Sequence, residues 1–171
     1  LLKMKEDLVV FLDFDGVLHH FFPIKEATDE QNSLFHYVPV FNDFIKSLGN
    51  HFDVKIVFAT SWKEKFSFED LRDFFEDYPE MQRAMVGSTP NLKSEKDKGA
   101  KWREAEQWMN DNNYNGRYII FDDYDVTWDN QEDNEDAFLY SLPTYFNKDL
   151  VVCNNGFKEE EIKAAHKLLG L

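Results

Sequence analysis

The sequence of 171 residues contains one cysteine, Cys153, and no long apolar run. A single cysteine cannot form an internal disulfide, which excludes a disulfide-stabilised secreted scaffold and indicates a reducing, cytoplasmic setting. The longest apolar run, Leu8–Leu12, is far shorter than the ~20 residues that span a bilayer, and no charged start followed by an apolar stretch resembles a signal peptide. We therefore expect a soluble protein with no membrane partner.

Basic residues are also few, since 19 Lys and Arg stand against 33 Asp and Glu and give a formal net charge of −14. This charge repels nucleic-acid phosphates at long range, so extended duplex binding is not expected. Surplus acid has two interpretations, a solvated surface or carboxylates that hold a divalent cation. The acidic run Asp129–Asp136 is predicted to be a solvated loop.

Short apolar runs rich in β-branched residues predict buried strands, and apolar residues at helical spacing predict helices between them. Their alternation predicts an α/β fold, a three-layer sandwich with a mainly parallel central sheet. No repeat or linker divides the chain, so residues 1–171 are predicted to form a single domain. The predicted strands are Leu8–Leu12, Val54–Ala59, Tyr118–Phe121 and Leu150–Cys153, with Arg83–Val86 as a weaker fifth, and the predicted helices are Val40–Leu48, Phe68–Phe75, Lys98–Met109 and Glu159–Leu169.

Polar residues follow three of the predicted strands directly. In open α/β sheets ligands bind at the carboxyl ends of the strands, so these side chains should converge on one edge. Carboxylates ~4 Å apart repel by about 4 kcal/mol at an effective dielectric of ~20, and a cluster of them needs a cation. Oxygen ligands without Cys or His favour Mg²⁺, which usually also binds a substrate phosphate. The residues are Asp13 and Asp15, Thr60 and Ser61, and Asp122 and Asp123.

The run Leu8–Leu18, in which an apolar strand precedes Asp-Phe-Asp-Gly-Val-Leu, resembles the first motif of the haloacid-dehalogenase-like (HAD) superfamily. Thr60 matches the second motif, a Thr or Ser that ends a strand, and Asp122-Asp123 matches the fourth, a strand that ends in two acids. The third motif is a basic residue at a helix start, for which Lys98 and Lys101 both qualify, and the Lys-Gly pair favours Lys98. The resemblance implies a HAD-like Rossmannoid fold.

A narrower resemblance links the chain to the HAD domains of Swiss-army-knife RNA repair proteins. It rests on Ala59–Lys63, Gly87–Pro90, Phe121–Asp125 and Asn155–Phe157. The chain departs from those domains at Lys63, where they tend to have arginine. The intervals between the motifs leave no room for a folded cap, so the fold should have no or a minimal cap. An open site favours a phosphate carried on something large, such as a nucleic-acid end.

The resemblance implies a Mg²⁺-dependent phosphatase that acts through an aspartyl-phosphate intermediate. Asp13 is the implied nucleophile and Asp15 the implied general acid and base. The alternatives are a small-molecule nucleotidase and a non-catalytic phosphate-binding module on the same fold. The implied Mg²⁺ ligands are Asp13, Asp15 through its backbone carbonyl, Asp122 and Asp123, and the implied phosphate-binding residues are Thr60, Ser61 and one of Lys98 and Lys101.

Several side chains near the motifs are candidates for contact with the substrate. His19 and His20 line the mouth of the site or bind a substrate base, or else are plain loop residues. Trp62 and the pair Phe21 and Phe22 are candidates for stacking on a base, which is worth about 1–3 kcal/mol per base, and a core position is the alternative for Trp62. The sequence alone leaves these alternatives open.

Overall fold

A five-stranded sheet forms the centre of the computed structural model, which describes residues 4–92, 101–123 and 149–171. Its order is β3-β2-β1-β4-β5, and every pair of neighbouring strands is parallel. The predicted α/β fold with a parallel central sheet is thereby confirmed. The strands are β1 (Glu6–Leu12), β2 (Phe52–Phe58), β3 (Met85–Ser88), β4 (Arg117–Asp122) and β5 (Leu150–Val152).

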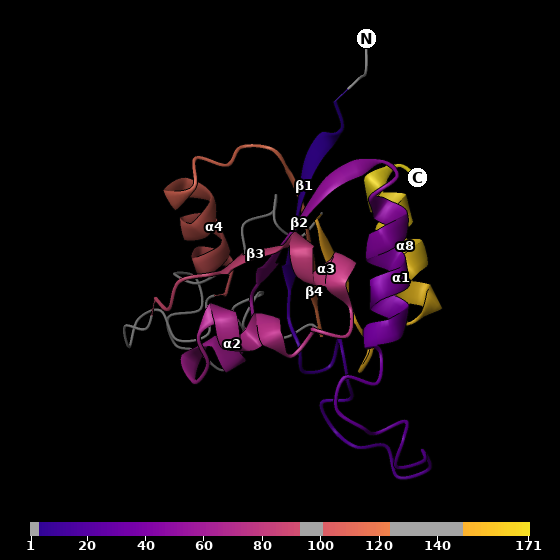
Figure 1. Cartoon of the computed structure of the whole chain (residues 1–171). Helices are drawn as coiled ribbons and strands as arrows, with labels where there is room; N and C mark the ends of the chain where they lie inside the picture. The colour runs from indigo at the N-terminus through magenta and orange to yellow at the C-terminus, as the bar shows by residue number, and fades with distance from the viewer. Residues whose placement is uncertain (1–3, 93–100, 124–148) are drawn as a thin grey trace, which may run out of the picture.

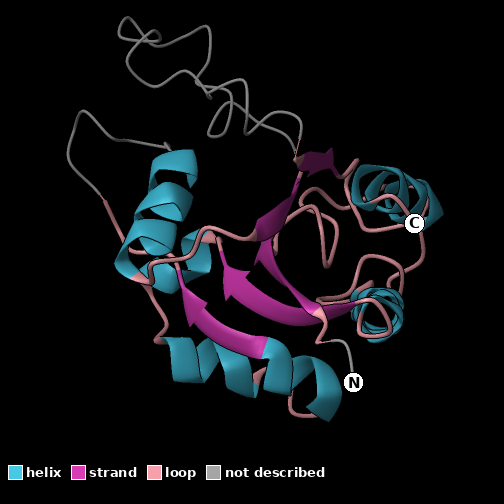
Figure 2. Cartoon of the chain, turned by 90° about the horizontal axis from the view of Figure 1, so that it is seen from above, coloured by secondary structure: helices cyan, strands magenta, loops and turns pink. Residues whose placement is uncertain are grey.

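Helices cover both faces of the sheet (Figures 1 and 2). Leu8, Val10 and Leu12 of β1 pack in one core cluster with residues of α1, α2, α3 and α8. Val9 and Phe11 point to the other face and pack in a second cluster with α4. Because β1 is buried on both faces, its sequence is a continuous apolar run without alternation. The helices are α1 (Val38–Leu48), α2 (Phe68–Asp73), α3 (Pro79–Ala84), α4 (Lys101–Asp111) and α8 (Glu159–Leu169).

The predicted start of the fifth strand is wrong, whereas the other strands agree with their predicted ranges to within two residues at each end. The fifth strand was expected over Arg83–Val86, but Arg83 and Ala84 are the last residues of α3, and β3 begins at Met85. Pro79 begins α3, a position where its fixed φ suits a helix and its missing N–H is not needed. β3 is an edge strand whose extent is set by its pairing with β2, so the local apolar run does not define it.

The intervals that precede β2 and β3 hold no additional sheet within the described residues. The chain between β1 and β2 forms a loop and α1, and the chain between β2 and β3 forms η1 (Ser61–Glu64), α2 and α3. All of α1, α2 and α3 contribute to the main core, which leaves no separate cap core in these intervals. None of the helices in residues 4–92, 101–123 and 149–171 is long and apolar enough to cross a lipid bilayer.

Candidate functional site

The carboxyl ends of the three central strands lie level with one another. Leu12 of β1 pairs with Phe58 of β2 and with Phe121 of β4. The backbone continues this alignment, because the amide of Asp13 donates to the carbonyl of Phe121 at 3.1 Å. The polar residues that follow β1, β2 and β4 therefore emerge at one edge of the sheet, as the sequence predicts.

Three carboxylates meet at this edge and form what we call the acidic cluster: Asp13, Asp122 and Asp123. Their ligand oxygens lie within 4.8 Å of one another. Asp13 and Asp122 are buried, and Asp123 is half-buried. The ammonium group of Lys101, from α4, lies 2.8 Å from Asp122 Oδ2 and 3.2 Å from Asp13 Oδ2. Lys98, the other predicted lysine, lies outside the described residues.

The charges of the acidic cluster are not balanced by Lys101 alone. Burial raises the pKa of Asp13 to about 7, with repulsion from Asp122 adding to the effect and Lys101 opposing it. Burial likewise raises the pKa of Asp123 to about 8, with further contributions from Asp122. Although burial opposes its charge, Lys101 has a raised pKa because the carboxylates of Asp122 and Asp13 stabilise the ammonium form. Buried, crowded oxygen donors with excess negative charge fit a divalent cation such as Mg²⁺.

The loop after β1 passes so close to the acidic cluster that it requires glycine. Gly16 has a φ of +77°, and a Cβ there would lie 2.4 Å from Asp123 Cβ. Its carbonyl accepts from the amide of Gly156, which connects this loop to the chain after β5. The glycine of the Asp-Phe-Asp-Gly motif therefore allows the loop to close against Asp123.

The carboxylate of Asp15 faces ring nitrogens of His19 and Trp62 and is not a member of the acidic cluster. His19 Nε2 lies 2.8 Å from Asp15 Oδ1, and Trp62 Nε1 donates to Asp15 Oδ2 at 3.2 Å. The hydrogen bond from His19 lowers the pKa of Asp15, partial burial opposes this shift, and Trp62 adds to it. His19 is thus a buried partner of Asp15, and Trp62 is half-buried against Phe14 and Phe35.

Thr60 and Ser61 lie at the start of η1, and one residue separates them from the end of β2. Thr60 is buried, and its Oγ1 accepts from the amide of Trp62 at 3.3 Å, which caps the short helix. Ser61 is exposed. The capping role of Thr60 is therefore visible in the structure, while phosphate binding by Thr60 and Ser61 stays a prediction.

A nearly buried ion pair beside the site has no counterpart in the sequence prediction. Lys63 Nζ lies 2.6 Å from Glu104 Oε1 and donates to Thr89 Oγ1 at 2.7 Å. Burial lowers the pKa of Lys63, and Glu104 opposes that shift. This pair fastens η1 to α4, the helix that carries Lys101. Its partners lie 41 residues apart in sequence, so no local pattern identifies them.

The loop between β1 and α1 is anchored by His20. Its two ring nitrogens lie 2.7 Å from Asn32 Oδ1 and 2.6 Å from the Tyr37 hydroxyl, and its side chain is buried. Phe21 and Phe22 are exposed on the same loop. His20 is therefore a structural anchor, and base stacking on Phe21 or Phe22 stays a prediction.

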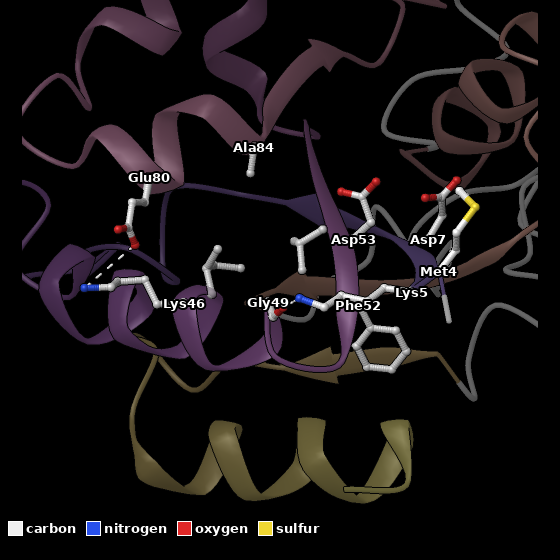
Figure 3. Close-up of a pocket in the computed structure, with 11 residues that line it drawn as sticks. Met4, Lys5, Asp7, Lys46, Gly49, Phe52, Asp53, Glu80 and Ala84 are labelled. Atoms are coloured by element: carbon white, nitrogen blue, oxygen red, sulfur yellow. Dashed lines mark hydrogen bonds and ion pairs between the residues drawn. The ribbon is translucent and has the colours of Figure 1, made fainter. Parts of the chain in front are cut away.

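The cavity in Figure 3 lies at the opposite, amino-terminal edge of the sheet. It has a volume of about 510 Å³, and Lys46 faces Glu80 across it at 3.8 Å. The amine of Lys5 donates to the carbonyl of Gly49. Among the described residues, the acidic cluster is the one group of three acids close enough to share a metal ion. The candidate site is therefore the acidic cluster and not this cavity.

A known family model matches most of the chain. Residues 9–159 match the family model described as the HAD domain in Swiss Army Knife RNA repair proteins, and this range includes every site residue predicted from the sequence. Searches of the curated proteins and of the solved structures found no match.

Proposed function

Because the chain belongs to the family of HAD domains in Swiss Army Knife RNA repair proteins, we propose that it is a Mg²⁺-dependent phosphatase with Asp13 as its nucleophile. The observation that carries this proposal is the acidic cluster with Lys101 at the carboxyl edge of the sheet. When bound by Asp13, Asp122, Asp123 and the backbone carbonyl of Asp15, Mg²⁺ would neutralise charge as an anionic carboxylate attacks an anionic phosphate.

The first step transfers the phosphoryl group to Asp13. A carboxylate oxygen of Asp13 attacks phosphorus, the bond from phosphorus to the leaving oxygen breaks, and Asp15 gives that oxygen a proton. The lowered pKa of Asp15 keeps most of the free enzyme in the ionised form, so esters with poor leaving groups should react slowly in this step. An ester whose leaving group is stable as an anion does not need the proton from Asp15 in this step.

The second step releases inorganic phosphate and restores Asp13. Asp15 takes a proton from a water molecule, the water oxygen attacks phosphorus, and the bond between phosphorus and Asp13 breaks. The ionised form of Asp15 suits it to act as this base.

We assign Lys101 and Thr60 to binding the phosphoryl oxygens in both steps. The ammonium group of Lys101 already lies beside the proposed nucleophile. Thr60 Oγ1 accepts from the amide of Trp62, so its own hydroxyl proton is available for donation to a phosphoryl oxygen. Ser61 and Lys98 are further proposed phosphate ligands.

Hydrolysis of p-nitrophenyl phosphate tests the assignment of Asp13. We expect turnover that requires Mg²⁺ and disappears in Asp13→Asn, which keeps the size of the side chain but removes its nucleophilic charge. Asp53→Asn is the matched control, because Asp53 is exposed at the opposite edge of the sheet. Retained activity in Asp13→Asn would refute the nucleophile.

For the substrate, we propose a phosphate at a nucleic-acid end. The family description supports a link to RNA repair, and the described intervals before β2 and β3 lack a cap that would enclose a small metabolite. The net charge of −14 disfavours contact with a long stretch of nucleic acid and so favours its terminus. Turnover of 3′- and 5′-phosphorylated oligonucleotides should exceed that of mononucleotides. The reverse order would identify a small-molecule nucleotidase.

A further inference from the structure

The two oxygens of the Asp15 carboxylate each contact a ring nitrogen, one from His19 and one from Trp62. His19 Nε2 lies 2.8 Å from Oδ1, and Trp62 Nε1 lies 3.2 Å from Oδ2. We propose that His19 and Trp62 are positioning residues that hold Asp15 in the orientation required for proton transfer. This inference rests on the proposed phosphatase function and adds to it two residues with a defined task.

The surroundings of His19 determine which of its nitrogens carries the proton. The ring is buried, with the rings of Phe35 and Trp62 at centroid distances of 5.4 and 5.8 Å. Among the described residues, His19 Nδ1 is buried without a hydrogen-bond partner. A proton on Nδ1 would be buried without an acceptor, whereas a proton on Nε2 is donated to a carboxylate. His19 is therefore the Nε2–H tautomer and a donor to Asp15.

The two donors come from separate segments, and the backbone fixes both. His19 follows Asp15 by four residues in a tight turn, in which the amide of Gly16 donates to the carbonyl of His19 at 2.9 Å. Trp62 belongs to η1, where the hydroxyl of Thr60 caps its amide. The positions of His19 and Trp62 are therefore set by the backbone and do not depend on the rotamer of Asp15.

This arrangement limits where Asp15 can exchange a proton. Each carboxylate oxygen has two lone pairs, and one on each oxygen already accepts a ring N–H. The remaining lone pairs must serve the leaving oxygen and the attacking water. Without the donors, the side chain of Asp15 could rotate away from the reacting atoms. Loss of these hydrogen bonds should slow the second step, the attack of water on the phosphorylated Asp13, more than the first. With an aryl phosphate, the leaving group of the first step is good enough to need no proton from Asp15.

Pre-steady-state kinetics with p-nitrophenyl phosphate and Mg²⁺ separates the two chemical steps. We expect His19→Phe to release about one p-nitrophenolate per site in a rapid burst, while kcat falls about tenfold or more and KM falls with it. His19→Gln, whose amide nitrogen can take the place of Nε2, should restore kcat to within about threefold of the wild type. Trp62→Phe tests the other donor, and His166→Phe is a matched control on the distant helix α8.

Specific outcomes overturn the inference. An unchanged kcat in both His19→Phe and Trp62→Phe would refute the positioning role, as would a His19→Gln variant as slow as His19→Phe. The tautomer can be measured independently of activity by long-range ¹⁵N–¹H correlation of the His19 ring, and an Nδ1–H tautomer would overturn the inference while leaving the phosphatase proposal intact. A wild-type protein that shows neither burst nor turnover would instead overturn the phosphatase proposal, and the positioning role with it.

Discussion

Lys101→Met is the substitution for which the structure gives the sharpest quantitative expectation. The ammonium group of Lys101 contacts two members of the acidic cluster, with distances of 2.8 Å to Asp122 and 3.2 Å to Asp13. At an effective dielectric of ~20, each contact corresponds to about 5–6 kcal/mol of Coulomb attraction. The desolvation of the buried ammonium offsets much of this attraction. Methionine matches the length of the aliphatic stem and removes the ammonium group, with its charge and its hydrogen bond to Asp122.

Removal of one partner from a buried ion pair typically costs about 3–5 kcal/mol, and we expect a loss of unfolding free energy of this size at pH 8 in the metal-free protein. Asp13 and Asp123 have pKa values of about 7 and about 8, so at lower pH both are largely protonated and depend less on the ammonium group. The destabilisation by Lys101→Met should therefore be smaller at pH 6 than at pH 8.

Urea and thermal unfolding with EDTA, at pH 6 and pH 8, measure this effect. A loss of 3–5 kcal/mol corresponds to a decrease in melting temperature of about 10 °C for a chain of this size. Lys46→Met is the matched control, because Lys46 and Glu80 form a half-exposed pair at 3.8 Å that contributes about 0.5 kcal/mol at most. We also expect phosphatase turnover to fall about 100-fold in Lys101→Met. Equal unfolding free energies for wild type and Lys101→Met at pH 8 would refute the electrostatic reasoning.

Other predictions concern the acidic cluster, a glycine and the second ion pair. Acids with raised pKa values bind more protons in the folded state, so the unfolding free energy without metal should fall from pH 5 to pH 8, and Mg²⁺ should raise the melting temperature more at pH 8 than at pH 6. An equal effect of Mg²⁺ at both pH values would contradict this. Gly16→Ala should cost about 3 kcal/mol or more in urea unfolding because its Cβ would collide with Asp123, whereas Gly170→Ala, with a φ of +74° and no atom within 4 Å, should cost about 1–2 kcal/mol. Comparable losses would argue against the close approach. Lys63→Met should cost about 3–5 kcal/mol because it leaves the largely buried carboxylate of Glu104 without its ammonium partner, and the double variant with Glu104→Leu should recover most of that loss in urea unfolding. A double variant as unstable as Lys63→Met would speak against the ion pair.

The sheet could be predicted well where burial alone dictates the sequence. Strands β1 and β4 are buried on both faces over most of their length, which produces apolar runs that need no partner to be recognised. The start of β3 could not be predicted in this way. Its four residues include Gly87 and, within the part of the chain that the structure describes, pair with one neighbour, β2, so tertiary pairing and the preceding Pro79 decide where α3 ends and the strand begins.

The candidate site likewise has features that local sequence predicts and features that depend on tertiary contacts. The convergence of Asp13, Thr60 and Asp122 follows from strand ends in a parallel sheet and could be predicted from local sequence. The direction of the Asp15 carboxylate could not, because it depends on a ring donor from η1, 47 residues away in sequence. The pair of Lys63 with Glu104 likewise depends on how α4 packs beside η1, which no sequence spacing encodes.

The level alignment of β1, β2 and β4 has a consequence for folding. Leu12, Phe58 and Phe121 come from segments far apart in the chain, so the acidic cluster forms only after long loops have closed. Such non-local pairing is a slow step in folding, and it couples the site to the cooperative unit of the whole sheet. Amide hydrogens such as those of Asp13 and Ala59, which bond between these strand ends, should therefore exchange with solvent only through global unfolding. The appearance of activity during refolding should accordingly coincide with completion of the sheet.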